Sequence, residues 1–200
     1  MRFMNIAEAA LMLTAFVVCA SSSVAQSSTA NEKLARPELA LTYSYVRSNA
    51  PPGGCTCFNL NGGSATFAWP IARGQFALAA DLMAAHGGGI SSNGYDLNLS
   101  SYTGGVRYTP RLAAMPVQPF GQVLIGLAHS SGSLVQGSGA PVANSSAAFA
   151  SNLGGGLDLK ASHRMWIRLF EADYLLTTFD NGSNNHQNNL RISAGAVIRF

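Results

Sequence analysis

The chain has 200 residues and a formal net charge of +3, and only 10% of its residues are charged, against about 25% in a typical soluble domain. So few charges would not cover a soluble surface, and the weak net charge does not indicate a nucleic-acid-binding protein. A helical membrane protein needs roughly 18 consecutive apolar residues per span, and no such run follows residue 25. A closed β-barrel is the other structure that satisfies its backbone hydrogen bonds in lipid.

The N-terminus has the pattern of a secretory signal peptide. Arg2 precedes an apolar stretch from Ala9 to Ala20, and Ser23 and Ala25 supply small residues for a signal peptidase. A membrane anchor is disfavoured because the stretch is short and no positive charge follows it. We therefore expect three parts: a signal peptide at 1–25, a short periplasmic segment at 26–37 and an outer-membrane barrel at 38–200.

Cleavage after Ala25 would remove Cys19 and leave Cys55 and Cys57. In an oxidising compartment these two cysteines either close a small, strained ring or remain free thiols. A lone C-x-C motif without a nearby histidine lacks the four ligands of a structural metal site. No metal and no cofactor is expected here.

From Glu38 onward, eight segments of roughly ten residues alternate apolar side chains with small or polar ones, the length and period of tilted transmembrane strands. The first contains Leu39, Leu41, Tyr43 and Tyr45 on one face. The others lie at about Asn61–Pro70, Gln75–Ala85, Asn98–Thr109, Val117–His129, Ala147–Lys160, Met165–Phe179 and Leu190–Phe200. The pattern predicts an all-β fold, an eight-stranded antiparallel up-and-down transmembrane barrel whose apolar faces meet lipid.

The seventh segment is the least regular, and the eighth is the sharpest. Glu171 and Asp173 share one parity while Arg168 has the other. Either a β-bulge intervenes or Arg168 reaches outward to the membrane interface, so the register there stays open. The eighth segment places Leu190, Ile192, Ala194, Ala196, Ile198 and Phe200 on a single face.

The connections alternate in predicted length. Those after the second, fourth and sixth segments are short, and the remaining ones are long and rich in Gly, Ser and Asn. Outer-membrane barrels combine short periplasmic turns with longer external loops. Aromatic residues near segment ends predict two girdles: Trp69, Tyr108, Trp166 and Phe200 on the turn side, and Tyr45, Phe149, Tyr174 and Phe179 on the loop side.

Several short motifs resemble those of the OmpA-transmembrane-domain and OmpX type of outer-membrane β-barrels. They are Tyr43-Ser-Tyr45, the run Gly154 to Asp158, Arg168 with Asp173-Tyr174, and the terminal Ile198-Arg199-Phe200. The resemblance implies an eight-stranded barrel in the cell outer membrane. It also implies that the barrel-assembly machinery recognises the C-terminal strand. It does not name a partner for the extracellular loops.

The inward faces carry Asp81, Arg107, Asp158, Glu171, Asp173 and Arg191. Such charges must pair inside a narrow barrel, as a structural plug or as the lining of an ion path. His86 and His186 are expected in polar loops, His163 in a turn, and His129 beside Ser130 at a strand end, and none lies in a catalytic motif. We expect no catalytic residue and no enzyme.

A structural or surface-interaction role through the external loops is the leading hypothesis. Two alternatives remain. A narrow, porin-like solute channel would need a continuous water path through the barrel. A soluble periplasmic ligand-binding barrel would bury its apolar face inward.

Overall fold

The computed structural model describes residues 36–48, 57–71, 75–90, 94–110, 115–132, 144–180 and 185–200. The expected signal peptide at 1–25 lies outside these residues, as do Cys55 and all but Arg36 and Pro37 of the segment 26–37. Eight strands form one closed antiparallel barrel in sequence order, as predicted. No helix in the described part of the chain is long and apolar enough to span a membrane.

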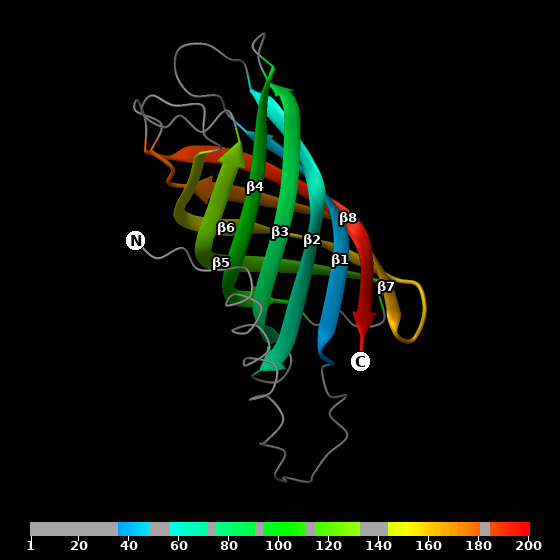
Figure 1. The fold of residues 1–200 in the computed structure, drawn as a ribbon. Helices are drawn as coiled ribbons and strands as arrows, with labels where there is room; N and C mark the ends of the chain where they lie inside the picture. The colour runs from blue at the N-terminus through cyan, green and yellow to red at the C-terminus, as the bar shows by residue number, and fades with distance from the viewer. Residues whose placement is uncertain are drawn as a thin grey trace. The chain divides into compact units, whose positions relative to one another are not determined.

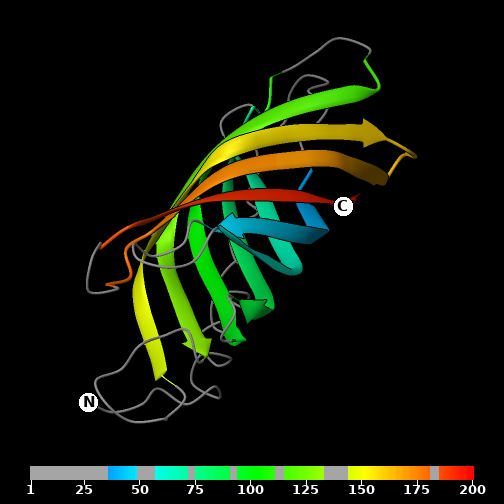
Figure 2. The ribbon, with the colours of Figure 1, turned by 90° about the horizontal axis from the view of Figure 1, so that it is seen from above.

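The strands are β1 (Glu38–Ser48), β2 (Phe58–Ile71), β3 (Phe76–Ile90), β4 (Tyr95–Tyr108), β5 (Val117–Gly132), β6 (Asn144–Lys160), β7 (Met165–Thr177) and β8 (Gln187–Arg199). Each pairs with the next, and β1 also pairs with β8, which closes the barrel. Figure 1 and Figure 2 show β1, in blue, beside β8, in red. The first residue of β1 and the last residue of β8 therefore lie at the same end of the barrel. This end also carries the β2–β3, β4–β5 and β6–β7 connections. We call it the turn end, and the opposite end the loop end.

The period-two pattern determines which side chains face outward. On β3, Leu78 is 55% exposed while its neighbours Ala79 and Asp81 are buried. On β5, Ile125 is 59% exposed and Leu124 is fully buried. The outward face is therefore a continuous apolar surface, the opposite of the arrangement that the soluble alternative needs, in which these residues form the core.

Most strands extend further than the sequence pattern indicated, chiefly toward the loop end. β3 continues to Ile90 and β4 begins at Tyr95, so the predicted long connection between them reduces to residues 91–94. His86 consequently lies within β3 and not in a loop. Backbone pairing can continue past the amphipathic segment because antiparallel hydrogen bonds do not require an apolar face.

The irregularity in β7 is a bulge. The pairing register shifts between Arg168 and Glu171 on the β8 side and at Leu157/Asp158 on the β6 side. Leu169 and Phe170 are both exposed, while Arg168 is completely buried. The extra residue switches the parity of the strand, and so Arg168 points inward together with Glu171 and Asp173.

Two of the predicted girdle aromatics face the interior instead. Trp166 pairs with the inward-facing Val197 and stacks against the Arg199 guanidinium, 3.8 Å from the ring centroid. Phe179 packs on buried apolar residues at the loop end. Trp69, Tyr108, Phe149, Tyr174 and Phe200 are exposed on the outside as predicted.

Candidate functional site in the barrel interior

Arg191 of β8 is the centre of a buried ionic network. Its Nη1 lies 2.6 Å from Asp81 Oδ2 on β3, and its Nη2 lies 2.6 Å from Asp173 Oδ2 and 2.9 Å from Glu171 Oε1, both on β7. All four side chains are at most 2% exposed. Buried charges of this kind are tolerated only when they are paired and hydrogen-bonded, and here one guanidinium joins three strands across the lumen.

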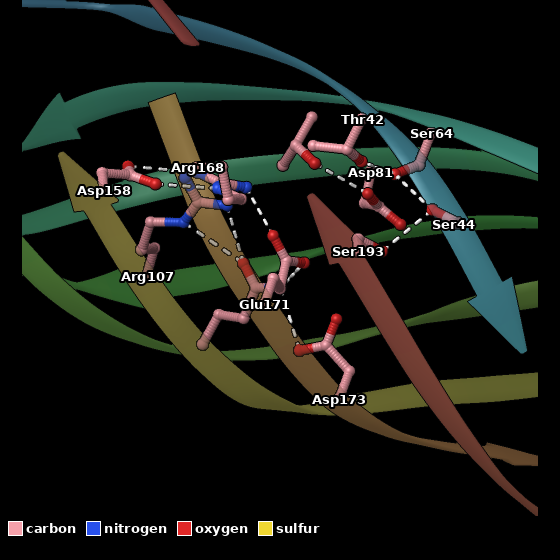
Figure 3. A network of polar contacts seen from close by, with 12 residues as sticks. Thr42, Ser44, Ser64, Asp81, Arg107, Asp158, Arg168, Glu171, Asp173 and Ser193 are labelled. Carbon is pink, nitrogen blue, oxygen red and sulfur yellow. Dashed lines mark hydrogen bonds and ion pairs between the residues drawn. The ribbon is translucent and has the colours of Figure 1, made fainter. Parts of the chain in front are cut away.

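The β7 bulge adds a second arginine to this network. Arg168 donates from Nε to Asp158 Oδ1 at 2.9 Å and from Nη1 to Glu171 Oε2 at 2.5 Å. Glu171 therefore lies between Arg168 and Arg191. Figure 3 shows Asp158, Arg168 and Glu171 facing one another between the strands.

A phenyl ring separates Arg168 from a third arginine. The guanidinium carbons of Arg168 and Arg107 lie 4.3 and 4.4 Å from the centroid of Phe120. This is favourable cation–π geometry. Arg107 also donates to Gln122 Oε1, and the Gln122 amide donates to Glu171 at 2.9 Å.

Glu38 joins the network to the turn end. Its carboxylate accepts from Arg107 Nη1 at 2.5 Å and from Arg199 Nε at 3.1 Å. These residues line a hollow of about 140 Å³ at the mouth of the barrel, together with Gln118 and Arg36. Glu38 and Arg199 were not among the inward charges predicted from the sequence, although their position at the ends of β1 and β8 follows from barrel closure.

Small hydroxyl side chains of β1, β2 and β8 lie next to the network, on the side of Asp81. Thr42, Ser44, Ser64 and Ser193 form a chain of hydrogen bonds of 2.7–3.1 Å, and Thr66 donates to Asp81 at 2.8 Å. Figure 3 shows this group beside Asp81. Two buried polar atoms among the described residues, Ser101 Oγ and Asn152 Oδ1, have no partner.

The loop-end half of the interior is mainly apolar, apart from a few hydrogen-bonded polar side chains such as Ser48, Thr177 and Asn189. Its buried apolar side chains include Val46, Leu60, Met83, Leu99 and Leu175, with Phe58, Tyr95 and Phe179 packed against them. This cluster was not predicted, because its members occupy inward positions near strand ends, where the sequence pattern indicated polar residues. The lumen is therefore divided into an ionic half at the turn end and an apolar half at the loop end.

All six inward charges selected from the sequence meet in this one network, whereas the histidines do not converge. His129 is exposed, and the adjacent Ser130 is buried on the opposite face of β5, so they form no nucleophile–base pair. His86 hydrogen-bonds Asn98 on the outside, and His163 lies 3.4 Å from Arg36. Within the described ranges, no three His, Cys, Asp or Glu side chains group as metal ligands.

The structural class of the protein is defined by a closed barrel of eight antiparallel strands. Its outer surface is apolar, and its interior holds a buried ionic network. The chain has the fold of the eight-stranded outer-membrane β-barrels. No protein-family model matches the sequence, and no curated protein sequence does.

Solved structures do match. The crystal structure of Neisserial surface protein A (NspA) is similar with a TM-score of 0.62 and 14% identity, over 82% of this chain and 97% of that one. Ail, the attachment invasion locus protein of Yersinia pestis, is similar with a TM-score of 0.53 and 17% identity, over 82% of this chain and 99% of that one. At these identities the similarity establishes the fold alone.

Proposed function

We propose that this chain is an integral protein of the bacterial outer membrane, a closed and non-conducting scaffold that presents its extracellular loops for a structural or surface-interaction role. The observation that carries the proposal is the filled lumen. Charge-paired side chains occupy one half and a packed apolar cluster occupies the other. A hydrated ion would have to lose its water against Leu60, Leu99 and Leu175 to pass.

The outward surface supports membrane insertion. Exposed apolar side chains cover all eight strands, among them Leu41, Leu78, Ile125, Leu153 and Ile192. A soluble protein rarely exposes so large a continuous apolar surface to water. In a membrane, the hydrocarbon chains of the lipids would cover this surface and keep it from water.

The names of the similar proteins agree with a surface role, one being called a surface protein and the other an attachment invasion locus protein. Ail has also been crystallised with the heparin analogue sucrose octasulfate. The loop segments of this chain, residues 49–57, 91–94, 133–143 and 178–186, contain Asp180 and no Lys or Arg. A polysulfated ligand needs cationic partners, and we therefore propose a neutral partner for these loops.

The narrow channel is the competing function, and single-channel recording in planar bilayers distinguishes the two. We expect membrane fractionation to recover the protein with the outer membrane, and the reconstituted protein to give no stepwise conductance. Steady ion conductance by the intact barrel would contradict the filled-lumen proposal. Recovery as a free periplasmic protein would refute membrane insertion.

A further inference from the structure

The outward surface of the barrel has a shallow, open hollow over β1, β2, β3 and β4. Its volume is about 620 Å³, and Leu41, Gly63, Ala65, Ala84, Ser100 and Tyr102 are among the residues that line it. Thr42, Ser64 and Met83 line it too, although their side chains point into the barrel. The floor of the groove is therefore strand backbone, which small outward side chains leave uncovered.

The strand register explains why the groove forms at this place. Gly63 pairs with Ala84, and Ala84 pairs with Ser100, so three small outward residues lie side by side on adjacent strands. The next outward positions toward the turn end are Ala65, Leu82 and Tyr102. The larger side chains of Leu41, Leu82 and Tyr102 form the walls of the groove.

The next outward positions toward the loop end are polar. Asn61 pairs with His86, and His86 pairs with Asn98. The Tyr43 hydroxyl donates to Asn61 at 2.6 Å, and His86 Nδ1 lies 2.8 Å from Asn98 Oδ1. Four residues beyond Tyr43 on β1, the exposed Arg47 donates to Asn59. An apolar groove thus ends at a row of hydrogen-bonding side chains with a cation beyond it.

We propose, on the basis of the membrane insertion argued above, that this groove binds one acyl chain of a phosphate-bearing lipid of the external leaflet. The chain lies over Gly63, Ala84 and Ser100. The headgroup lies at the loop-end side, against Asn61, His86 and Asn98. The groove is apolar along its length and polar at its loop-end side. Lipids of the external leaflet have their headgroups toward the loop end, so their chains and headgroups match these two parts of the groove.

A second copy of the barrel is a poorer occupant. A symmetric dimer would place the same concave surface of each copy against the other. Two facing hollows leave unfilled space, and a void forfeits dispersion contacts on both sides. A flexible acyl chain fills an irregular groove, and it does not require the polar row to be buried.

The test compares two substitutions on one face of one strand. Ala84→Leu fills the groove, whereas Ala80→Leu adds the same side chain at an exposed outward position of β3 that does not line it. Folding of each variant is checked by the heat-dependent shift in gel mobility. Each folded variant is incubated with palmitoyl-oleoyl phosphatidylglycerol in mild detergent, and native mass spectrometry counts the lipid retained. If Ala84→Leu does not fold, Ser100→Leu replaces it as the variant that fills the groove.

We expect the wild type and Ala80→Leu to retain one lipid per barrel, and Ala84→Leu to retain about tenfold less, because the added isobutyl group displaces buried methylenes. Equal retention by all three would overturn the proposal while leaving membrane insertion intact. A diacylglycerol with the same chains should be retained less well. Equal retention of it would refute the assigned headgroup position.

A cysteine at position 84 tests for the second copy. In a background in which Cys55 and Cys57 are replaced by Ser, Ala84→Cys should stay monomeric in oxidised membranes, because a lipid chain separates it from other barrels. Disulfide-linked dimers would show that the groove is a protein interface and would overturn the lipid proposal. Fractionation of the same membranes reports independently on the proposed function.

Discussion

Arg191 is the residue on which the interior depends most. It forms ion pairs with Asp81, Glu171 and Asp173 at once. Its removal takes away the arginine with which Asp81 and Asp173 pair, and leaves Glu171 paired with Arg168. Removing one partner of a buried ion pair typically costs about 3–5 kcal/mol. We expect Arg191→Leu to lower the free energy of unfolding by at least that range, measured by urea titration in lipid vesicles with tryptophan fluorescence.

Arg47→Leu is the matched control for this prediction. Arg47 is exposed and makes a hydrogen bond to Asn59, which water can replace. Its loss should change the stability far less than the loss of Arg191. Equal effects of the two substitutions would mean that the lumen charges are solvated and that the plug is not dry.

The outward face can be tested residue by residue. Leu78, Ile125 and Ala194 are exposed on β3, β5 and β8. An arginine at the middle of a bilayer destabilises an inserted barrel by about 2–4 kcal/mol, and by less near the interfaces. We expect that cost for Ile125→Arg or Ala194→Arg in vesicle unfolding experiments, and a smaller cost for Leu78→Arg, because Leu78 pairs with the girdle residue Trp69.

Labelling separates lipid contact from a general loss of stability. A lipid-phase spin or fluorescence probe on Leu78→Cys should report hydrocarbon contact, and the same probe site at Ala79→Cys should not, because Ala79 is buried inside. Contact at position 79 and its absence at 78 would reverse the facing on which the membrane assignment depends.

At the scale of the element, β6 shows how closely the strands approach. A Cβ added to Gly156 would lie 2.3 Å from the Phe170 carbonyl oxygen and 3.0 Å from a Phe120 ring carbon. A Cβ at Gly104 of β4 would lie 3.6 Å from its nearest neighbour, Ala79 O, an ordinary contact. The glycine of β6 is therefore required by the space between strands.

We accordingly expect Gly156→Ala to destabilise the barrel by about 1–3 kcal/mol, the usual cost of overpacking. Gly104→Ala should leave the unfolding midpoint nearly unchanged. Both are measured in the same vesicle titration. An unchanged midpoint for Gly156→Ala would mean that β6 and β7 can separate to admit a methyl group without loss.

At the scale of the whole molecule, the connections predict the orientation, because those after β1, β5 and β7 are longer than any at the turn end, although the one after β3 is short. An even strand number returns both barrel termini to the turn end, which we place in the periplasm. Epitope tags inserted at Asn93, Gly139 or Ser183, in connections at the loop end, should be tolerated and reach antibody on intact cells. Tags at Arg73 or His163, in connections at the turn end, should stay hidden, and their labelling in intact cells would invert the orientation.

The sequence alone was sufficient for the strand number, the closed up-and-down order and the facing of nearly every strand. These depend on local alternation, since neighbouring side chains of a strand point to opposite faces. The six inward charges followed from the same rule. At Arg168, however, parity fails because a bulge adds one residue, and periodicity could not choose between a bulge and an outward arginine.

Only the tertiary structure decided the partners and the division of the lumen. Arg191 and Asp81 are 110 positions apart, and their contact depends on the tilt and closure of the barrel, which no local pattern contains. The same closure brings Glu38 to both Arg107 and Arg199. It also gathers Val46, Leu60, Leu99 and Leu175 into the apolar half. Alternation assigns each side chain to a face, but which side chains meet across the lumen is decided by the three-dimensional path of the strands.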